Sequence, residues 1–123
     1  MAKTILIVED EQPLRDALED KLKKEGFVAL IAKNGLEAVE VATAEKPDLI
    51  LLDLMMPGKN GLDVLQEIRQ NIGIFQTPVI VLTNLEATAD IEKALEMGAT
   101  TYLVKATYSL EEVVGKIKKT LGE

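Results

Sequence analysis

The sequence contains neither cysteine nor histidine. Without cysteine the chain has no disulfide bonds, no thiolate nucleophile and no cysteine-ligated zinc. Without histidine it lacks the most common acid–base side chain and the most common metal ligand. Any metal ion that this chain binds must therefore be a hard cation held by oxygen atoms.

Aromatic residues and long apolar runs are also scarce. Aromatic residues make up 3% of the 123 residues, whereas 47% are hydrophobic, so the core must be built from aliphatic side chains. No apolar run approaches the roughly 18 residues of a membrane span. The N-terminus also lacks the longer apolar region of a signal peptide. We expect a soluble, cytoplasmic protein in which residues 1–123 form a single domain, with no effector domain.

Positive charge is in deficit, because 14 lysines and arginines face 21 acidic residues and the net charge is −7. This balance argues against a surface that neutralises nucleic-acid phosphates. We therefore expect no direct binding to nucleic acid by this chain, and no association with a membrane.

Five short apolar segments predict strands. Four of them are continuous rather than alternating, which is typical of strands buried on both faces of a parallel sheet. These four are residues 5–8, 49–52, 79–82 and the weaker 102–104. A fifth segment, residues 27–31, follows Gly26 and is predicted to lie toward an edge.

Stretches with helical periodicity lie between these segments, and each has an apolar face. The faces consist of Leu14, Leu18 and Leu22; of Leu62, Leu65 and Ile68; and of Leu110, Val113, Val114, Ile117 and Leu121. The alternation of strands and helices predicts an α/β fold, a three-layer doubly wound domain around a five-stranded parallel sheet.

Proline, glycine and asparagine mark the ends of these helices. Pro13 fits the first turn of the first helix, and Gly26 its C-terminal end. Asn34, followed three residues later by Glu37, predicts a capping box for the second helix. Pro47 and Gly98 are predicted to end the second and fourth helices.

Polar residues follow four of the five predicted strands. Residues 9–11 (Glu-Asp-Glu) follow the first, Asp53 the third, Thr83 the fourth and Lys105 the fifth. Ligands of open α/β sheets bind outside the carboxyl ends of the strands. The predicted topology therefore brings these side chains to one edge of the sheet.

Such a cluster suits phosphoryl chemistry with an oxygen-bound cation. Neighbouring carboxylates repel one another, and Mg²⁺ can offset the repulsion with Asp10, Asp53 and a backbone carbonyl beyond Asp53 as ligands. A carboxylate can also attack phosphorus and form an acyl phosphate. Lys105 can supply a cation to the transferred group, and Thr83 a hydroxyl donor.

Each of these residues also has an ordinary explanation. Residues 9–11 can cap the following helix, and Asp53 can belong to a turn. Thr83 can be a strand residue, Lys105 a solvated surface lysine and Tyr102 a half-buried amphipathic side chain. The functional reading explains all five features together, whereas the ordinary one needs five separate accounts.

Taken in order, the polar segments resemble the receiver domain of bacterial two-component response regulators. The matching segments are Val8-Glu9-Asp10-Glu11, Leu52-Asp53-Leu54-Met55-Met56-Pro57-Gly58, Leu82-Thr83 and Val104-Lys105. The resemblance covers essentially the whole chain and is most specific from Asp53 to Gly61. It implies a flavodoxin-like fold with strand order 2-1-3-4-5.

The resemblance implies that Asp53 accepts a phosphoryl group from a phosphohistidine, on either a sensor histidine kinase or a histidine phosphotransfer protein. It implies that Asp10, Asp53 and the Met55 carbonyl bind Mg²⁺, or Mn²⁺, and that Glu9 acts at least through water. Any enzymatic activity would be limited to weak autophosphorylation and autodephosphorylation.

It further implies a conformational switch. Lys105 would pair with the phosphoryl oxygens or with Asp53, Thr83 would move inward, and Tyr102 would follow from an outward to an inward rotamer. The surface of helix four, strand five and helix five would then change and control a downstream protein target or an effector domain outside this chain. Met55 and Leu85, both apolar, occupy positions that tune dephosphorylation, so we expect slow phosphate loss.

Four features depart from the family pattern. Ala106 replaces the proline that usually follows the lysine, and Asn84 replaces a small residue after the switch threonine. Thr100 and Thr101 stand where winged-helix regulators have two acids before the tyrosine. Helix five lacks the dimer-face arginine of those regulators and carries Lys116, Lys118 and Lys119 instead. We therefore expect a monomer or a weak dimer.

Three alternatives remain open from the sequence. A pseudo-receiver would share the fold and act as a constitutive protein-interaction module. A haloacid-dehalogenase-like hydrolase needs a second acid two residues after the nucleophile, where this chain has Met55. A nucleotide-binding domain needs a glycine-rich loop after the first strand, where this chain has three acids.

Overall fold

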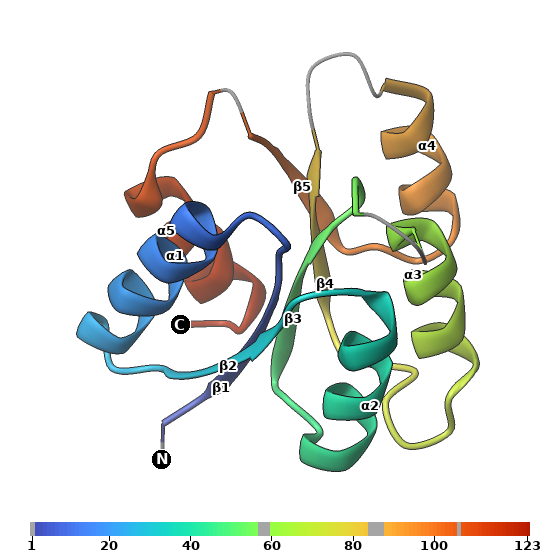
Figure 1. Cartoon of the computed structure of the whole chain (residues 1–123), viewed down its shortest axis with the longest axis horizontal. Coiled ribbons are helices and arrows are strands. Elements are labelled where there is room, and N and C mark those ends of the chain that lie inside the picture. Colours follow the sequence, from blue (N-terminus) through green and yellow to red (C-terminus); the bar gives the residue numbers. More distant parts are fainter. Residues whose placement is uncertain (1, 57–59, 84–87, 106) are drawn as a thin grey trace.

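A parallel sheet at the centre of the molecule organises the chain (Figure 1). The computed structural model describes residues 2–56, 60–83, 88–105 and 107–123. The strands are β1 (Thr4–Val8), β2 (Val28–Ala32), β3 (Leu49–Asp53), β4 (Val79–Thr83) and β5 (Thr101–Val104). The helices are α1 (Gln12–Lys24), α2 (Gly35–Glu45), α3 (Gly61–Gln70), α4 (Thr88–Glu96) and α5 (Leu110–Thr120).

The strand order is β2-β1-β3-β4-β5, and every strand pair is parallel. The predicted fold class and strand order are therefore confirmed, with β2 at an edge. The strand bounds differ slightly from those predicted. Asp53 and Thr83 are the last residues of β3 and β4 rather than the residues that follow them. The edge strand begins at Val28, and Phe27 before it is buried in the core.

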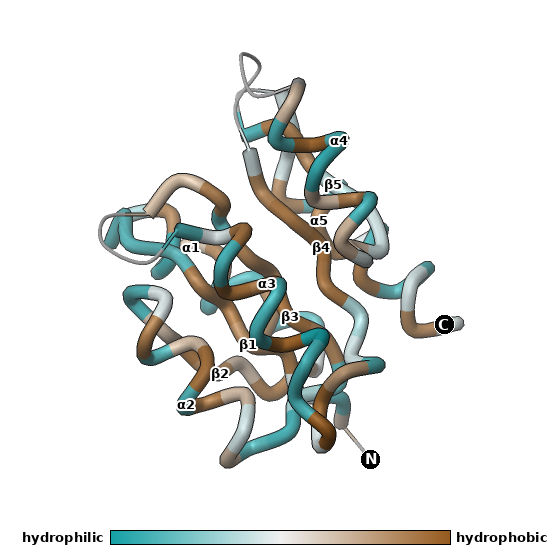
Figure 2. Tube along the Cα trace, turned by 90° about the vertical axis from the view of Figure 1, so that its right-hand side faces the viewer, coloured by the Kyte–Doolittle hydropathy of each residue, from teal (hydrophilic) through white to brown (hydrophobic). Residues whose placement is uncertain are grey.

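Helices cover both faces of the sheet, with α1 and α5 on one face and α2, α3 and α4 on the other (Figure 1). Successive strand residues point to opposite faces. Ile5 and Ile7 of β1 belong to the core under α1 and α5, whereas Leu6 and Val8 belong to the core under α2 and α3. Burial on both faces explains the continuously hydrophobic runs of β1, β3 and β4, which are brown in Figure 2. The prediction of burial on both faces was wrong for β5, because Leu103 is its only buried residue and Tyr102 is 38% exposed at the edge of the sheet. In the described part of the chain, no helix is long and apolar enough to cross a membrane.

The predicted helix faces are confirmed, and their central members are buried: Leu18 and Leu22, Leu65 and Ile68, and Val113, Val114 and Ile117. The other members pack against the same cores but are only partly buried: Leu14, Leu62, Leu110 and Leu121. Pro13 lies in the first turn of α1 as predicted. Gly26 and Gly98 follow α1 and α4 with φ of 91° and 101°, a region that favours glycine. Glu45 is the last residue of α2, and Lys46 lies between it and Pro47.

The capping box predicted for α2 forms in part. The Asn34 side chain accepts a hydrogen bond from the Glu37 N–H, as expected for an N-cap. The Glu37 carboxylate, however, accepts from the N–H of Lys33 at 3.2 Å, one residue before the cap. A complete capping box forms instead at α5, between Ser109 and Glu112.

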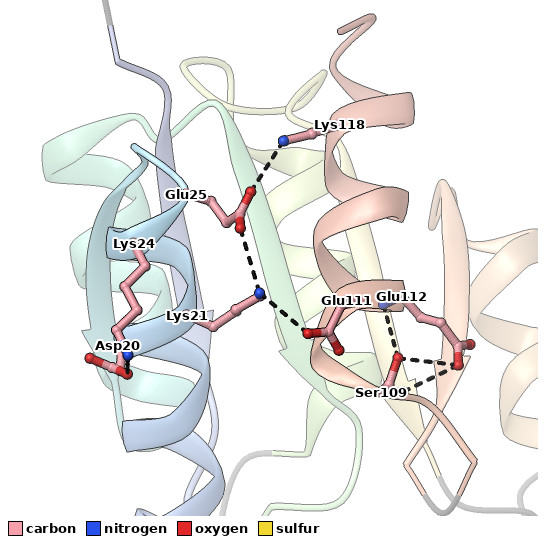
Figure 3. A network of polar contacts seen from close by, with 8 residues as sticks. All are labelled: Asp20, Lys21, Lys24, Glu25, Ser109, Glu111, Glu112 and Lys118. Atoms are coloured by element: carbon pink, nitrogen blue, oxygen red, sulfur yellow. Dashed lines mark hydrogen bonds and ion pairs between the residues drawn. The ribbon is translucent and has the colours of Figure 1, made fainter.

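Ion pairs join α5 to α1 on one face of the sheet (Figure 3). Lys21 lies 3.4 Å from Glu111, and Lys118 lies 3.2 Å from Glu25. These side chains are partly exposed, so the pairs add little to stability. The apolar core beneath them, which includes Leu18, Leu22 and Ile117, contributes most of the free energy that holds the two helices against the sheet.

Gly61 begins α3 in direct contact with the end of β3. A Cβ atom at this position would lie 2.5 Å from the Leu54 Cα and 2.7 Å from the Asp53 carbonyl oxygen. The Asn60 side chain caps the same helix by accepting from the N–H of Asp63. The close approach of α3 to the Asp53 backbone therefore requires glycine.

We predict that Gly61→Ala lowers the free energy of unfolding by about 1–3 kcal/mol, because backbone atoms must shift to admit a methyl group. Gly115→Ala is the matched control on α5, where a Cβ atom meets nothing within 4 Å. That substitution should raise stability by about 0.4–1 kcal/mol. Urea denaturation measures both changes, and a destabilised Gly115→Ala or an unchanged Gly61→Ala would contradict this account.

Candidate functional site

Three acidic side chains meet at the carboxyl ends of β1 and β3. Val8 pairs in register with Leu52, so the residues that follow each of them lie side by side. One carboxylate oxygen from each of Glu9, Asp10 and Asp53 lies within 4.8 Å of the others. The side chains of Glu9 and Asp53 are fully buried. Hard oxygen donors at this spacing can hold a divalent metal ion.

Lys105 extends from the end of β5 into this acidic cluster. Its Nζ donates a hydrogen bond to Asp53 Oδ2 at 2.9 Å and lies 3.0 Å from Glu9 Oε1. The more exposed Glu11 carboxylate lies 3.6 Å away. Burial alone would lower the pKa of Lys105, but its interactions with Asp53 and Glu9 outweigh burial and raise it. The lysine is therefore a fixed positive charge among the acids.

The charge of the cluster is incompletely balanced. Burial, and after it the neighbouring Asp53 carboxyl, raise the pKa of Glu9 from 4.5 to about 7, against the opposing effects of the Glu11 N–H and Lys105. Glu9 Oε1 is buried and accepts no well-aligned hydrogen bond from the described residues. The site therefore stabilises additional positive charge, whether a proton or a cation.

Backbone groups fix the orientation of two of these carboxylates. The Met55 N–H donates to Asp53 Oδ1 at 2.9 Å, and the Glu11 N–H donates to Glu9 Oε2 at 3.1 Å. Asp53 thus has the local contact expected of a turn residue, while its second oxygen faces Lys105. Glu11 is the N-cap residue of α1, yet its side chain makes no capping hydrogen bond. Capping by Glu11 therefore does not explain the acidic run.

Arg15, which the sequence analysis did not single out, supports the loop that carries the acids. Its Nη1 donates to the carbonyl oxygens of Glu9 at 3.1 Å and Asp10 at 3.3 Å, and the residue is 9% exposed. Arg15 shares the buried side of α1 with Leu18 and Leu22. A charged residue on the apolar side of a helix was the signal that could have identified it.

Thr83 lies at the end of β4, between the strands that carry Asp53 and Lys105. The side chain is buried, and its hydroxyl finds no hydrogen-bond partner among the described residues. Its carbonyl oxygen accepts from the Lys105 N–H at 2.6 Å. An unpaired buried hydroxyl is costly, so this one is available to a group that enters the site.

Tyr102 points away from the acidic cluster. The residue is 38% exposed, and its ring centroid lies 5.6 Å from the Nζ of Lys116. Met55 is also exposed. The remaining sequence predictions concern Leu85, Asn84 and Ala106, which lie outside the residues that the structure describes, as do positions 57 and 58 of the motif.

Tyr108 lies beside the site and was likewise not anticipated. It packs against the core under α1 and α5, and its buried hydroxyl has no partner among the described residues. Burial, and after it the charge of Glu9, raise the pKa of Tyr108. Its position three residues after Lys105, in a chain with few aromatic residues, was the available signal.

Comparisons with known proteins agree with this arrangement. Residues 5–118 match the family described as the response regulator receiver domain. The receiver domain of a Pseudomonas aeruginosa sensor histidine kinase, solved with a magnesium ion coordinated in its active-site cleft, is 28% identical, with 100% of both chains covered and a TM-score of 0.90.

Two further solved structures are similar along nearly their whole length. The signal receiver domain of a histidine kinase from Syntrophus aciditrophicus is 30% identical, with 98% of this chain and 91% of that chain covered and a TM-score of 0.89. The receiver domain of a Francisella response regulator is 26% identical, with 98% and 97% covered and a TM-score of 0.88.

We predict that Lys105→Met lowers the free energy of unfolding by roughly 1–3 kcal/mol in buffer without divalent cations, because buried carboxylates lose their countercharge. The matched control is Lys24→Met, which removes the exposed Lys24–Asp20 pair at 3.0 Å. Urea denaturation should show no clear change for this control. Equal changes in the free energy of unfolding for the two substitutions would show that the buried pairs stabilise the fold no more than the exposed pair does.

Proposed function

The chain belongs to the response regulator receiver family of two-component signalling, and from this premise we propose that it is a phosphorylation-activated switch whose phosphoacceptor is Asp53. The observation that carries the proposal is the environment of the Asp53 carboxylate. It is buried, it contacts the ammonium of Lys105 at 2.9 Å, and it lies beside the carboxylates of Glu9 and Asp10.

In the proposed reaction, a carboxylate oxygen of Asp53 attacks the phosphorus of a phosphohistidine. The new O–P bond forms an acyl phosphate while the N–P bond breaks, and the released imidazole nitrogen takes up a proton. Lys105 then balances the negative charge gained by the Asp53 side chain, since its Nζ already lies in contact with that carboxylate. The donor is a sensor histidine kinase or a histidine phosphotransfer protein.

The donor set at this site fits Mg²⁺ or Mn²⁺, because its ligands are closely spaced carboxylate oxygens that share a single ammonium group, that of Lys105, among the described residues. Asp10, Asp53 and the Met55 carbonyl would hold the ion, with Glu9 acting through water. A bound divalent ion supplies charge neutralisation to the phosphoryl oxygens. The similar receiver domain from Pseudomonas aeruginosa, which was solved with magnesium in its active-site cleft, supports this assignment.

The switch begins at Thr83. Its hydroxyl is buried and has no hydrogen-bond partner in the part of the chain that the structure describes, so it is available to donate to a phosphoryl group on Asp53. Movement of Thr83 toward Asp53 would leave space for the outward ring of Tyr102 to turn inward, which would alter the surface of α4, β5 and α5. Two such states need differ by only a few kcal/mol for a new charge to shift their populations.

The output of this cytoplasmic switch would be contact with a downstream protein or with an effector domain outside residues 1–123. The chain would not act as an enzyme beyond slow self-phosphorylation and phosphate loss. The exposed, apolar Met55 side chain, together with Leu85, would keep that loss slow by offering no polar group to orient a water molecule.

We predict that incubation with acetyl phosphate and Mg²⁺ adds one phosphoryl group to the wild-type chain. The intact mass, measured by mass spectrometry, should show no such gain for Asp53→Asn or after removal of Mg²⁺ by a chelator. Asp16→Asn, on the exposed side of α1, is the matched control and should be labelled like the wild type.

A phosphoryl gain that persists in Asp53→Asn would assign the acceptor elsewhere. A folded wild-type sample that gains no mass and also fails to bind beryllofluoride would favour the pseudo-receiver, a constitutive interaction module.

A further inference from the structure

Tyr108 lies beside the acidic cluster, and the proposed reaction gives it no role. It is one of only two tyrosines in the chain. Its hydroxyl is buried and has no hydrogen-bond partner among the residues that the structure describes. A phenylalanine would fill the same space without burying a polar group. The hydroxyl is therefore costly to the fold unless it binds something.

The turn before α5 holds the ring of Tyr108 in place. Its N–H donates to the Val104 carbonyl oxygen at 3.2 Å, and the next residue, Ser109, is the N-cap of α5. Tyr108 is thus one residue before the cap, and Val113 is the fourth residue of the helix, which are the two positions of a hydrophobic staple. Both residues pack in the core under α1 and α5. The ring therefore has a fixed place at the start of α5.

The hydroxyl of Tyr108 lies near Glu9. Leu14, at the start of α1, packs against the same core as Tyr108, and α1 begins just after the loop that carries Glu9. Burial raises the pKa of Tyr108, and among the charged groups around it Glu9 has the largest effect, ahead of Lys105 and Asp53. The phenol therefore stays protonated at neutral pH and has one O–H to donate on the side of Glu9.

One oxygen of the Glu9 carboxylate can accept a further hydrogen bond. Oε2 accepts from the Glu11 N–H at 3.1 Å, whereas Oε1 lies 3.0 Å from the ammonium of Lys105. Oε1 is buried, and this contact is not aligned as a hydrogen bond. A carboxylate oxygen has two lone pairs, so Oε1 has room for another donor besides the ammonium.

We propose that Tyr108 is a positioning residue of the acidic site, and that its hydroxyl donates to one water molecule, which donates in turn to Glu9 Oε1. No direct hydrogen bond joins the two side chains. A water that bridges two buried polar groups is nearly as favourable as a direct bond. The consequence rests on the proposed function, because a Glu9 carboxylate held charged and in a fixed orientation strengthens the binding of a divalent cation at this site.

Tyr108→Phe tests the proposal, because it removes the hydroxyl and keeps the ring with its packing. Isothermal titration with Mg²⁺ should show an affinity about three- to tenfold lower than that of the wild type, the loss expected for one hydrogen bond. Thr107→Val is the matched control. It removes an exposed hydroxyl from the same turn, which donates to the Val104 carbonyl oxygen at 3.4 Å, and it should bind Mg²⁺ within about twofold of the wild type.

Tyrosine fluorescence adds a readout that a packing role alone would not change. The chain has no tryptophan, so all tyrosine emission of Tyr102→Phe comes from Tyr108. Mg²⁺ should change this emission with the dissociation constant that calorimetry gives, because the cation alters the charge of the carboxylate to which Tyr108 is joined. In a wild-type crystal grown with Mg²⁺, the water should lie about 2.5–3.0 Å from both Tyr108 Oη and Glu9 Oε1.

Equal Mg²⁺ affinities of Tyr108→Phe and the wild type would overturn the proposal. So would a Tyr108 emission that Mg²⁺ leaves unchanged, or a crystal structure in which no water joins the two side chains. These results would leave the proposed function intact. A wild type that binds no Mg²⁺ would instead reject the cation site of the proposed function, and the role of Tyr108 with it.

Discussion

Lys105 reaches from the end of β5 past β4 to the buried carboxylates of Asp53 and Glu9, and its ammonium lies 2.9 Å and 3.0 Å from them. Charges buried in this way are stable only when they are paired. One cation faces three clustered acids. Burial, and after it the neighbouring Asp53 carboxyl, raise the pKa of Glu9 to about 7. The site can therefore accommodate a divalent cation, and the proposed phosphoryl group on Asp53 would change the balance that holds Lys105 in place.

Contacts on two neighbouring strands lie between this site and the surface. The Lys105 N–H binds the carbonyl oxygen of Thr83, whose own hydroxyl is buried and unpaired among the described residues. On the neighbouring strand β5, the Tyr102 ring and carbonyl contact Lys116 of α5. These contacts are hydrogen bonds and a cation–ring contact that can be exchanged for others, as a two-state switch requires. The core packing beneath them provides a rigid frame.

The fold and the position of the site could be predicted from sequence, because continuous apolar runs require strands buried on both faces and parallel strands end at one edge. That argument placed Asp10, Asp53 and Lys105 together without side-chain detail. It did not reveal Arg15 or the contact between Tyr102 and Lys116, since these depend on how side chains turn once the helices have packed. From sequence, only the family resemblance supported a role for Gly61. The structure shows the physical reason, because the Asp53 carbonyl oxygen leaves no room for a Cβ atom there. The predictions for Asn84, Leu85 and Ala106 stay predictions.

The central claim is that the acids at the ends of β1 and β3 form one cation site that prepares Asp53 for phosphoryl transfer. Isothermal titration with Mg²⁺ tests it most directly. We expect one ion per wild-type chain, and affinity lower by a factor of about 10–100 in Asp10→Asn. Asp16→Asn should bind as the wild type does. Equal affinity of the wild type and Asp10→Asn for Mg²⁺ would contradict the account.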